Sequence, residues 1–357
     1  MGLDQRAERF EALQREKLDA AWRADLPGST VPHVVVALPS YSVERSVYEH
    51  YGDRIGPLEH RYLYALLRSK DPGTRTVYLS SKPVPPDVVA GYMALAPVEA
   101  HDTIRDNSLL LSPDDDSPRP LAEKVLDNPA LLDAIREFAG DDPALIEPWN
   151  VTEAERDLAV ALGMPMNGTD PDLRGLATKS EGRKLFRAAG VPVAAGIEDV
   201  STPDEVAVAI LTMRRRDPAL PGVVVKLDDS VAGDGNVVLR FEEHGLAPDD
   251  EAATADLVRA SLPDWYVEVL RSGGVVEELV VGDGFCSPSG QGALLPDGTV
   301  EVIATHDQRL GGPNGQVYEG CSFPARAGYA DAIAEHVRAV GEALVSHGAV
   351  GRFAVDF

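Results

Sequence analysis

The chain has 357 residues, a length sufficient for two or three domains. Hydrophobic residues make up 44% of it and charged residues 25%, a composition typical of globular proteins. Its 58 acidic and 33 basic residues give a net charge of −25, which argues against a nucleic-acid-binding surface, because phosphate backbones require clustered Lys and Arg. Cys286 and Cys321 lie too far apart for a metal-ligand spacing and imply neither a disulfide framework nor a zinc site.

The first part of the chain alternates helices with apolar strands. The expected elements are helix 3–24, strand 33–38, helix 58–70, strand 76–79, helix 87–95 and helix 152–162. This alternation predicts a parallel α/β layer. A Pro-containing linker at 165–171 follows, and we place the end of a first domain, residues 1–168, within it. The N-terminus lacks an apolar signal region and no long apolar run follows, so we expect a cytoplasmic protein without a membrane partner.

A different rhythm begins beyond the linker. Thr178, followed three residues later by Glu181, has the form of a capping box and opens a helix that ends at Gly190. The expected later elements are strand 191–194, helix 203–216, helix 251–261, strands 265–270 and 275–281, short strands within 283–322, and helix 330–347. The final strand, 352–357, places Arg352 and Asp356 on one face.

The segment 223–239 predicts a phosphate-binding hairpin. An apolar strand ends at Lys226, a polar loop with Gly233 and Gly235 follows, and a second apolar strand begins at Val237. A lysine beside a loop with free backbone N–H groups is suited to hold a polyphosphate. A Walker-type loop or a dinucleotide fingerprint would need a helix after the loop, and the third glycine of the fingerprint is absent as well. We therefore expect a hairpin lid over a nucleotide.

Several segments, taken together and in order, resemble the ATP-grasp ligases, most closely the peptide ligases related to the pheganomycin ligase. These segments are 57–63, 177–186, 189–192, the Lys226 hairpin, 276–282, 305–308 with 311–312, and 351–357. The resemblance implies an α/β and α+β architecture. A Rossmann-like pre-ATP-grasp domain (1–168) would precede an ATP-grasp N-terminal lobe with the hairpin lid (169–281) and the start of a C-terminal lobe (282–357).

The resemblance assigns ATP-binding roles to residues of the two lobes. Lys179 and Lys226 match the two lysines that bind ATP phosphates. Taken alone, Lys179 could be a solvated residue of a first helical turn and Lys226 an edge-strand lysine. The remaining nucleotide contacts would come from the hairpin glycines, from the 277–280 segment at adenine and from the ribose position: Gly233, Gly235, Glu277, Glu278, Val280 and Asp283. Glu277 and Glu278 point to opposite faces of a regular strand, so only one can reach adenine, and we favour Glu277.

The same resemblance implies a metal ligand, a catalytic cation and substrate contacts. Asp356 would bind Mg²⁺ (or Mn²⁺), and Arg352 and Lys226 would act on the transferring phosphoryl group. Either Arg352 or Asp356 could equally belong to a cross-strand ion pair. The substrate candidates are polar residues of 306–309 and of the turn after strand 33–38: His306, Asp307, Arg309, Ser40 and Tyr41. Helix caps, surface pairs or a structural histidine would explain these residues as well.

The activity implied is ATP-dependent ligation of a carboxylate to an amine or peptide, through an acyl phosphate and with release of ADP and phosphate. The partners would be small molecules, and the oligomeric state is left open, with a homodimer as one alternative. The family pattern continues beyond Asp356 with a second acidic ligand and an asparagine, which this sequence does not contain. We therefore expect a fragment with weak or no ligase activity. A non-catalytic ATP-binding or regulatory module of the same fold is the alternative.

Overall fold

The computed structural model describes residues 3–42, 55–230, 235–282, 284–312, 315 and 317–357. The chain divides into two compact units. Unit 1 consists of Met1–Asp172, Leu295–Gly298 and Ala349–Gly351, and unit 2 of Leu173–Leu294, Thr299–Gly348 and Arg352–Phe357. The division of the second part into two ATP-grasp lobes at residue 281 stays a prediction.

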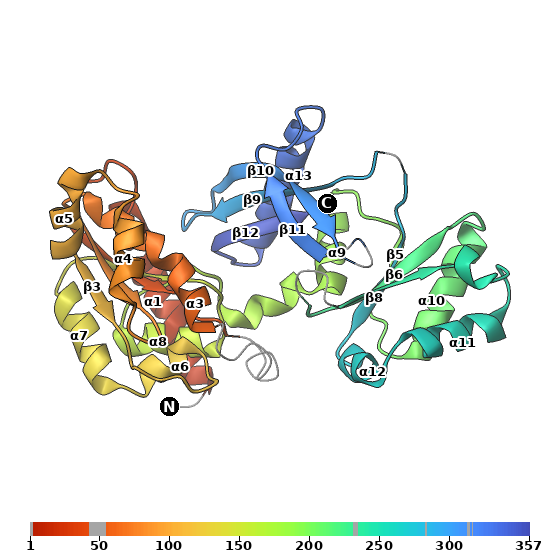
Figure 1. Ribbon diagram of the computed structural model, residues 1–357, viewed down its shortest axis with the longest axis horizontal. Coiled ribbons are helices and arrows are strands. Elements are labelled where there is room, and N and C mark those ends of the chain that lie inside the picture. Colours follow the sequence, from red (N-terminus) through yellow and green to blue (C-terminus); the bar gives the residue numbers. More distant parts are fainter. Residues whose placement is uncertain (1–2, 43–54, 231–234, 283, 313–314, 316) are drawn as a thin grey trace. The chain divides into compact units, whose positions relative to one another are not determined.

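Unit 1 is built on a parallel sheet with helices on both faces (Figure 1). The strand order is β3-β2-β1-β4, which we call sheet 1, and the strands are β1 (His33–Leu38), β2 (Thr74–Leu79), β3 (Ser108–Leu111) and β4 (Ala144–Pro148). All six residues of β1 are buried, as expected for a strand covered on both faces. The predicted parallel α/β layer is thus confirmed.

Alternate residues of β1 serve two separate cores. Val34, Val36 and Leu38 pack with one group of helices, and Ala37 packs with the other. The first group is α1 (Leu3–Ala24), α6 (Leu121–Leu126), α7 (Pro129–Ala139) and α8 (Glu153–Leu162). The second group is the 3-10 helix η2 (Arg61–Lys70), α4 (Pro86–Met93) and α5 (His101–Asp106). Short helical segments complete the described part of this unit: α3 (Ile55–His60), η3 (Val98–Ala100) and η4 (Pro171–Ala177), the last of which continues into unit 2.

Unit 2 contains two four-stranded sheets. Sheet 2 has the order β5-β8-β6-β7, with β5 (Gly196–Ile197), β6 (Gly222–Leu227), β7 (Asn236–Arg240) and β8 (Gly274–Glu278), all antiparallel. Its core is closed by α10 (Pro203–Arg216), α11 (Glu251–Ser261) and α12 (Asp264–Leu270). The 3-10 helix η5 (Glu242–His244) follows β7. The expected strand–loop–strand hairpin at Lys226 is present as β6 and β7.

Sheet 3 packs against one long helix. Its order is β11-β10-β9-β12, with β9 (Ser287–Leu294), β10 (Val300–Gly311), β11 (Val317–Ser322) and β12 (Gly351–Asp356). The helix α13 (Ala330–Ser346) contacts β9 and β10, and α9 (Lys179–Ala188) packs against α13. The core between them includes Leu185, Ile333, Val337 and Val355.

Two predicted strands are wrong. Residues 265–270 form helix α12, in which Tyr266 and Leu270 are buried while Trp265 and Val269 are exposed. Burial four residues apart is the spacing of one helix face, so packing overrides the β-propensity of this aromatic and β-branched segment. Residues 191–194 have no regular structure, and the only strand nearby in the described chain is the two-residue β5.

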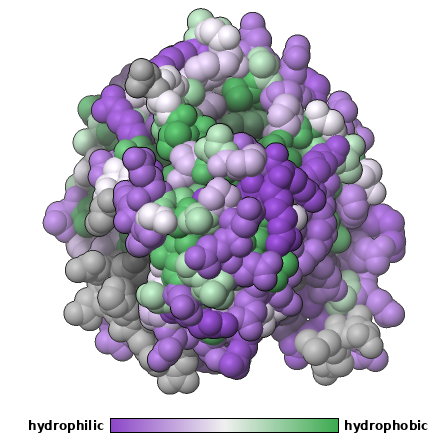
Figure 2. Space-filling model, turned by 90° about the vertical axis from the view of Figure 1, so that its right-hand side faces the viewer, coloured by the Kyte–Doolittle hydropathy of each residue, from purple (hydrophilic) through white to green (hydrophobic). Residues whose placement is uncertain are grey.

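The surface of the described residues is mainly hydrophilic on the face seen in Figure 2. Figure 2 shows a face on which hydrophilic side chains predominate and apolar ones lie among them in small groups. Among the described residues, none of the helices is both long enough and apolar enough to cross a membrane.

Candidate functional site

Lys226 lies near the end of β6, between two neighbouring strands. It is paired in register with Asn236 of β7 on one side and with Val275 of β8 on the other. The residues before and after it are buried, whereas its own side chain is 26% exposed and forms an ion pair with the Glu277 carboxylate. The buried strand therefore fixes the backbone of Lys226 and leaves the ammonium group to a polar environment.

Lys179 reaches the loop that follows β6. It is the first residue of α9, whose N-cap Thr178 accepts a hydrogen bond from the Glu181 N–H. The Lys179 ammonium group donates to Leu227 O at 2.8 Å, Ser230 O at 3.0 Å and Ser230 Oγ at 2.8 Å. Burial, and then the positive charge of Lys226, lower the pKa of Lys179. The structure thus brings together the two lysines that the sequence pairs.

Of the two glycines predicted in the hairpin loop, Gly235 lies within the described residues. Gly233 lies outside the described residues. The Gly235 carbonyl accepts a hydrogen bond from the Leu227 N–H at 3.2 Å and lies 2.9 Å from the Tyr266 hydroxyl. A Cβ at Gly235 would come within 2.6 Å of Ser230 Cβ, so the close approach of the loop requires a glycine there. Its predicted phosphate contact stays a prediction.

The two adjacent glutamates of β8 have different partners. Glu277 is 9% exposed, and besides Lys226 it accepts a hydrogen bond from Arg183 Nη1 at 2.5 Å. Burial raises the pKa of Glu277, but Lys226 and Arg183 outweigh burial, so the pKa is lowered and the carboxylate stays ionised. Glu278 accepts from the Ala195 N–H at 2.7 Å. Glu277 therefore belongs to the lysine cluster, while the adenine contact predicted for it is untested.

The chain after β8 holds the remaining predicted nucleotide residues. Val280 is exposed, as is its neighbour Val281. Asp283, the predicted ribose contact, lies outside the described residues.

The residues predicted to bind the metal and the transferring phosphoryl group, Asp356 and Arg352, lie on one face of sheet 3. Phe353 of β12 lies against Gly292 and Gly341, and Val355 packs with α13. By alternation, Arg352 and Asp356 lie on the opposite face, and both are exposed. His306 shares that face. Its register partner is Ser289, next to Gly290, which faces α13. His306 is buried beneath Phe323 and contacts Gln291 at 2.9 Å.

Asp307 and Arg309 lie on the other face of β10. Asp307 accepts hydrogen bonds from the Tyr329 hydroxyl and from the Arg326 N–H, and the Tyr329 interaction raises the pKa of that phenol. Arg309 donates to Ser322 Oγ at 3.0 Å. Strand alternation thus places His306 on one face of β10 and Asp307 and Arg309 on the other, and the substrate contact predicted for each of the three residues stays a prediction.

Ser40 and Tyr41 follow β1 at the carboxyl edge of sheet 1, as predicted. Ser40 Oγ accepts a hydrogen bond from the Ala122 N–H in the first turn of α6 at 3.2 Å, so it caps that helix. The Tyr41 ring stacks on Trp149, with centroids 5.5 Å apart. The alternative of a structural cap thus accounts for Ser40, and a substrate contact at either residue is untested.

Arg183 was part of the recognised 177–186 segment but received no role from the sequence. It lies four residues after Lys179 in α9, and both side chains reach sheet 2 or the loop beyond β6. A lysine and an arginine spaced i, i+4 share one helix face, and this spacing was the signal that could have identified Arg183.

The donor set can be compared with the needs of a nucleotide and its metal. Two ammonium groups near a helix N-terminus fit a polyphosphate. Within the described part of the chain, no three His, Cys, Asp or Glu side chains gather as a metal cage would require. Mg²⁺ bound to nucleotide phosphates usually takes only one or two protein carboxylates, a requirement that a single exposed Asp356 fits.

We compared the sequence and the fold of the chain with those of known proteins. No protein-family model matches the chain. Over 304 residues it is 33% identical to the L-propargylglycine–L-glutamate ligase of Streptantibioticus cattleyicolor, an alignment covering 81% of this chain and 60% of that protein. The biotin carboxylase of Campylobacter jejuni, solved as a complex with beta-gamma-ATP, has a TM-score of 0.57 at 14% identity, covering 92% of this chain and 62% of that one. The chain has the ATP-grasp fold.

A second ATP-grasp structure supports the same conclusion. The ADP complex of N5-carboxyaminoimidazole ribonucleotide synthetase has a TM-score of 0.51 at 16% identity, covering 91% of this chain and 66% of that chain. The resemblance to ATP-grasp ligases and the mixed α/β fold class inferred from the sequence are confirmed. The chain spans 60% of the length of the ligase that it resembles in sequence.

Proposed function

We propose that this chain belongs to an ATP-dependent carboxylate–amine ligase that forms a peptide or peptide-like amide. The observation that carries the proposal is the convergence of Lys179 and Lys226 beside the buried Glu277, in a chain with the ATP-grasp fold. A pair of ammonium groups neutralises phosphate charge. In phosphoryl transfer, positioning and neutralisation supply most of the catalysis.

The reaction would run in two steps. A substrate carboxylate oxygen attacks the γ-phosphorus of ATP, the bond to the β-phosphate oxygen breaks, and an acyl phosphate and ADP result. The amine nitrogen then attacks the acyl carbon, the carbon–oxygen bond to phosphate breaks, and the amide, phosphate and a proton are released. Lys179 and Lys226 would hold the ATP phosphates, and Arg352 would bind the transferring phosphoryl group or the acyl phosphate.

The metal and the substrates extend this proposal. Asp356 would bind Mg²⁺, which neutralises phosphate charge, and Arg352 shares its sheet face. The relative from Streptantibioticus cattleyicolor is a ligase of two amino acids by name, so amino acids are the first substrates to test. A cytoplasmic location is part of the proposal.

The deciding experiment measures which products ATP yields. The full-length protein would be incubated with Mg-ATP and a pool of amino acids, with the phosphorus-containing products followed by ³¹P NMR and the amide by mass spectrometry. Release of ADP and phosphate together with a new amide is expected. Release of AMP and pyrophosphate would contradict the acyl-phosphate route.

Lys226→Ala tests the nucleotide site directly. Loss of a charge-assisted contact of about 1.5–3 kcal/mol should weaken ATP binding roughly 10- to 150-fold. The matched control is Lys184→Ala. Lys184 lies on helix α9, and its ammonium group forms ion pairs with Glu181 and Asp199 at the exposed surface. Isothermal titration calorimetry with Mg-ATP compares the two variants. Equal affinities in both would remove Lys226 from the site.

A further inference from the structure

Arg183 is a buried arginine that ties three separate segments together. Its side chain is 7% exposed. Nη1 donates to Glu277 Oε1 at 2.5 Å, Nε to Glu198 Oε1 at 2.6 Å, and Nη2 to the Ala194 carbonyl at 2.6 Å. The guanidinium group thus joins α9 to strand β8 and to the residues on either side of β5. All of its nitrogens are engaged by protein groups, so Arg183 is held in one position.

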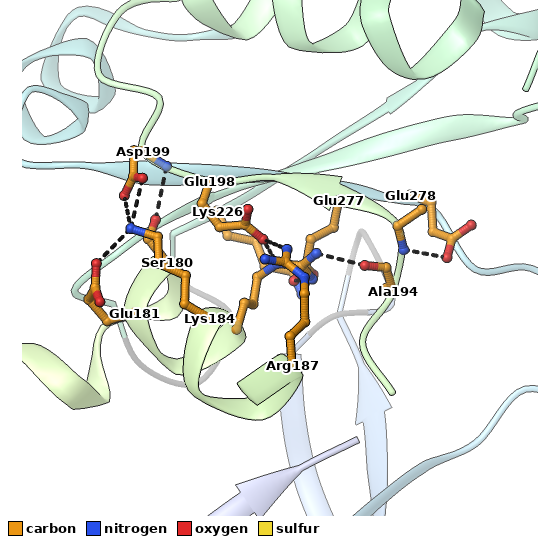
Figure 3. A network of polar contacts seen from close by, with 12 residues as sticks. Ser180, Glu181, Lys184, Arg187, Ala194, Glu198, Asp199, Lys226, Glu277 and Glu278 are labelled. Carbon is orange, nitrogen blue, oxygen red and sulfur yellow. Dashed lines mark hydrogen bonds and ion pairs between the residues drawn. The ribbon is translucent and has the colours of Figure 1, made fainter. Parts of the chain in front are cut away.

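The Glu277 carboxylate is shared between two cations. One oxygen faces Arg183, and the other forms the ion pair with Lys226. Figure 3 shows Lys226 and Glu277 directed toward each other, with Glu198 and Arg187 in the same polar network. The charges alternate along the row Lys226, Glu277, Arg183, Glu198 and Arg187, and each neighbouring pair is in contact.

The Arg183 guanidinium group fits beside β5 because residue 196 is a glycine. A Cβ added at Gly196 of β5 would lie 2.8 Å from Arg183 Nη2 and 2.7 Å from the Val276 carbonyl. The guanidinium group therefore occupies the space beside β5 that a larger residue at 196 would take. Arg183 is packed into sheet 2 and does not reach outward toward a ligand.

We propose that Arg183 is a positioning residue for nucleotide binding, which keeps Glu277 ionised and in place when Lys226 turns from Glu277 to the ATP phosphates. This inference rests on the proposed function. Lys226 forms an ion pair with Glu277, so binding to a phosphate must compete with that ion pair. A buried carboxylate that lost its only cation would be strongly disfavoured. Arg183 remains as the second cation, and it thereby lowers the cost of releasing Lys226.

The role is distinct from contact with the ligand. Arg183 acts on the nucleotide only through Glu277, so its effect must disappear when Glu277 carries no charge. Arg187 provides the matched control, because it also pairs with Glu198 from the same helix, whereas the ion pairs of Glu277 within the described part of the chain are with Arg183 and Lys226. Loss of Arg187 therefore disturbs the same row of charges without removing the partner of Glu277.

The experiment measures Mg-ATP affinity of the whole chain by isothermal titration calorimetry. Arg183→Met should weaken binding at least tenfold, Arg183→Lys should recover part of that loss, and Arg187→Met should stay within twofold of the unsubstituted protein. In a Glu277→Gln background, Arg183→Met should change the affinity less than threefold, because the two residues are coupled. An equal loss in both backgrounds, or an Arg183→Met affinity equal to that of Arg187→Met, overturns the inference.

Two further readings separate this inference from the proposed function and from misfolding. If the unsubstituted protein does not bind Mg-ATP, the proposed function fails, and the inference falls with it. If the protein binds Mg-ATP and the Arg183 variants match the control, only the inference fails. Should Arg183→Met not fold by circular dichroism, Arg183→Lys decides the matter. Its affinity should fall two- to fivefold, and an unchanged affinity contradicts the role.

Discussion

Lys179 and Lys226 carry the same charge in different surroundings. Lys226 faces a carboxylate, whereas the Lys179 ammonium group donates its hydrogen bonds to uncharged oxygens of Leu227 and Ser230. Burial and the neighbouring Lys226 charge disfavour the protonated form of Lys179, which lowers its pKa. Phosphate oxygens would reverse that penalty, so ligand binding and protonation at Lys179 are linked.

This linkage predicts a pH dependence of ATP affinity. In the proposed site, the ATP phosphates would bind the protonated form of Lys179. ATP affinity would then be full at pH values below the lowered pKa of Lys179 and fall as the pH rises through that pKa, which lies below the usual lysine value of about 10.4. Lys179→Arg keeps its charge throughout this range and should flatten the early part of the decline. Calorimetric titrations of Mg-ATP from neutral to alkaline pH measure both slopes. Identical slopes would exclude Lys179 as the titrating group.

At the residue scale, the sequence predicted that Lys179 and Lys226 lie together, but it did not predict which residues contact their carboxylate neighbour. The pairing of Lys179 with Lys226 followed from the resemblance, and the structure brings them together. The role of Arg183 was missed because a buried arginine is recognised by what surrounds it, and Glu277, its partner, is 94 residues away in sequence. The sequence grouped Asp307 with His306 by proximity along the chain, whereas adjacent residues of a strand face opposite sides, so the two side chains lie on different faces of β10.

The contact between α13 and sheet 3 depends on small residues at the scale of elements. A Cβ at Gly290 of β9 would lie 2.4 Å from Val337 of α13, and one at Gly341 would lie 2.5 Å from Val300. The helix can approach the sheet closely only because these positions have no side chain. This close approach directs Phe353 and Val355 inward and leaves Arg352 and Asp356 on the outer face.

Gly290→Ala should therefore destabilise the protein through overpacking, by about 1–3 kcal/mol. The control is Gly328→Ala, where a Cβ would have no neighbour within 4 Å. Urea denaturation followed by circular dichroism compares the two variants. A midpoint for Gly290→Ala equal to that of Gly328→Ala would show that α13 can shift to accommodate the methyl group.

The predicted elements of the chain succeeded where burial followed one periodicity. Strand β1 and helices α10 and α11 have the predicted bounds, because uninterrupted apolar runs and capped amphipathic helices are local signals. Helix α12 was predicted as a strand, since its aromatic and β-branched residues favour strands in isolation. Only the core of sheet 2, which receives Tyr266 and Leu270, selects the helix.

At the scale of the whole molecule, the two main hydrophobic cores of unit 1 and the two of unit 2 each lie within one unit. Heating should therefore give two calorimetric transitions, and only the transition of unit 2 should respond to nucleotide. At an ATP concentration about 100 times Kd, the stabilisation of unit 2 should be about 2.7 kcal/mol. Lys226→Ala, with its roughly 10- to 150-fold weaker binding, should reduce this stabilisation to between about 1.4 and 0.3 kcal/mol and leave the other transition unchanged. A nucleotide-dependent shift of both transitions would contradict independent units.

The distribution of unit 1 along the sequence has a consequence for how such a protein can be recombined. Unit 1 takes residues from three separate stretches, the last two being Leu295–Gly298 and Ala349–Gly351. Within it, Thr169 and Val350 exchange two hydrogen bonds, at 2.7 and 3.0 Å. A gene fusion with a single crossover after Asp172 would separate Thr169 from its native partner. Unit 1 would then be built from segments of two different proteins. Exchange of unit 2 between relatives would therefore require matched replacements at several places in the gene.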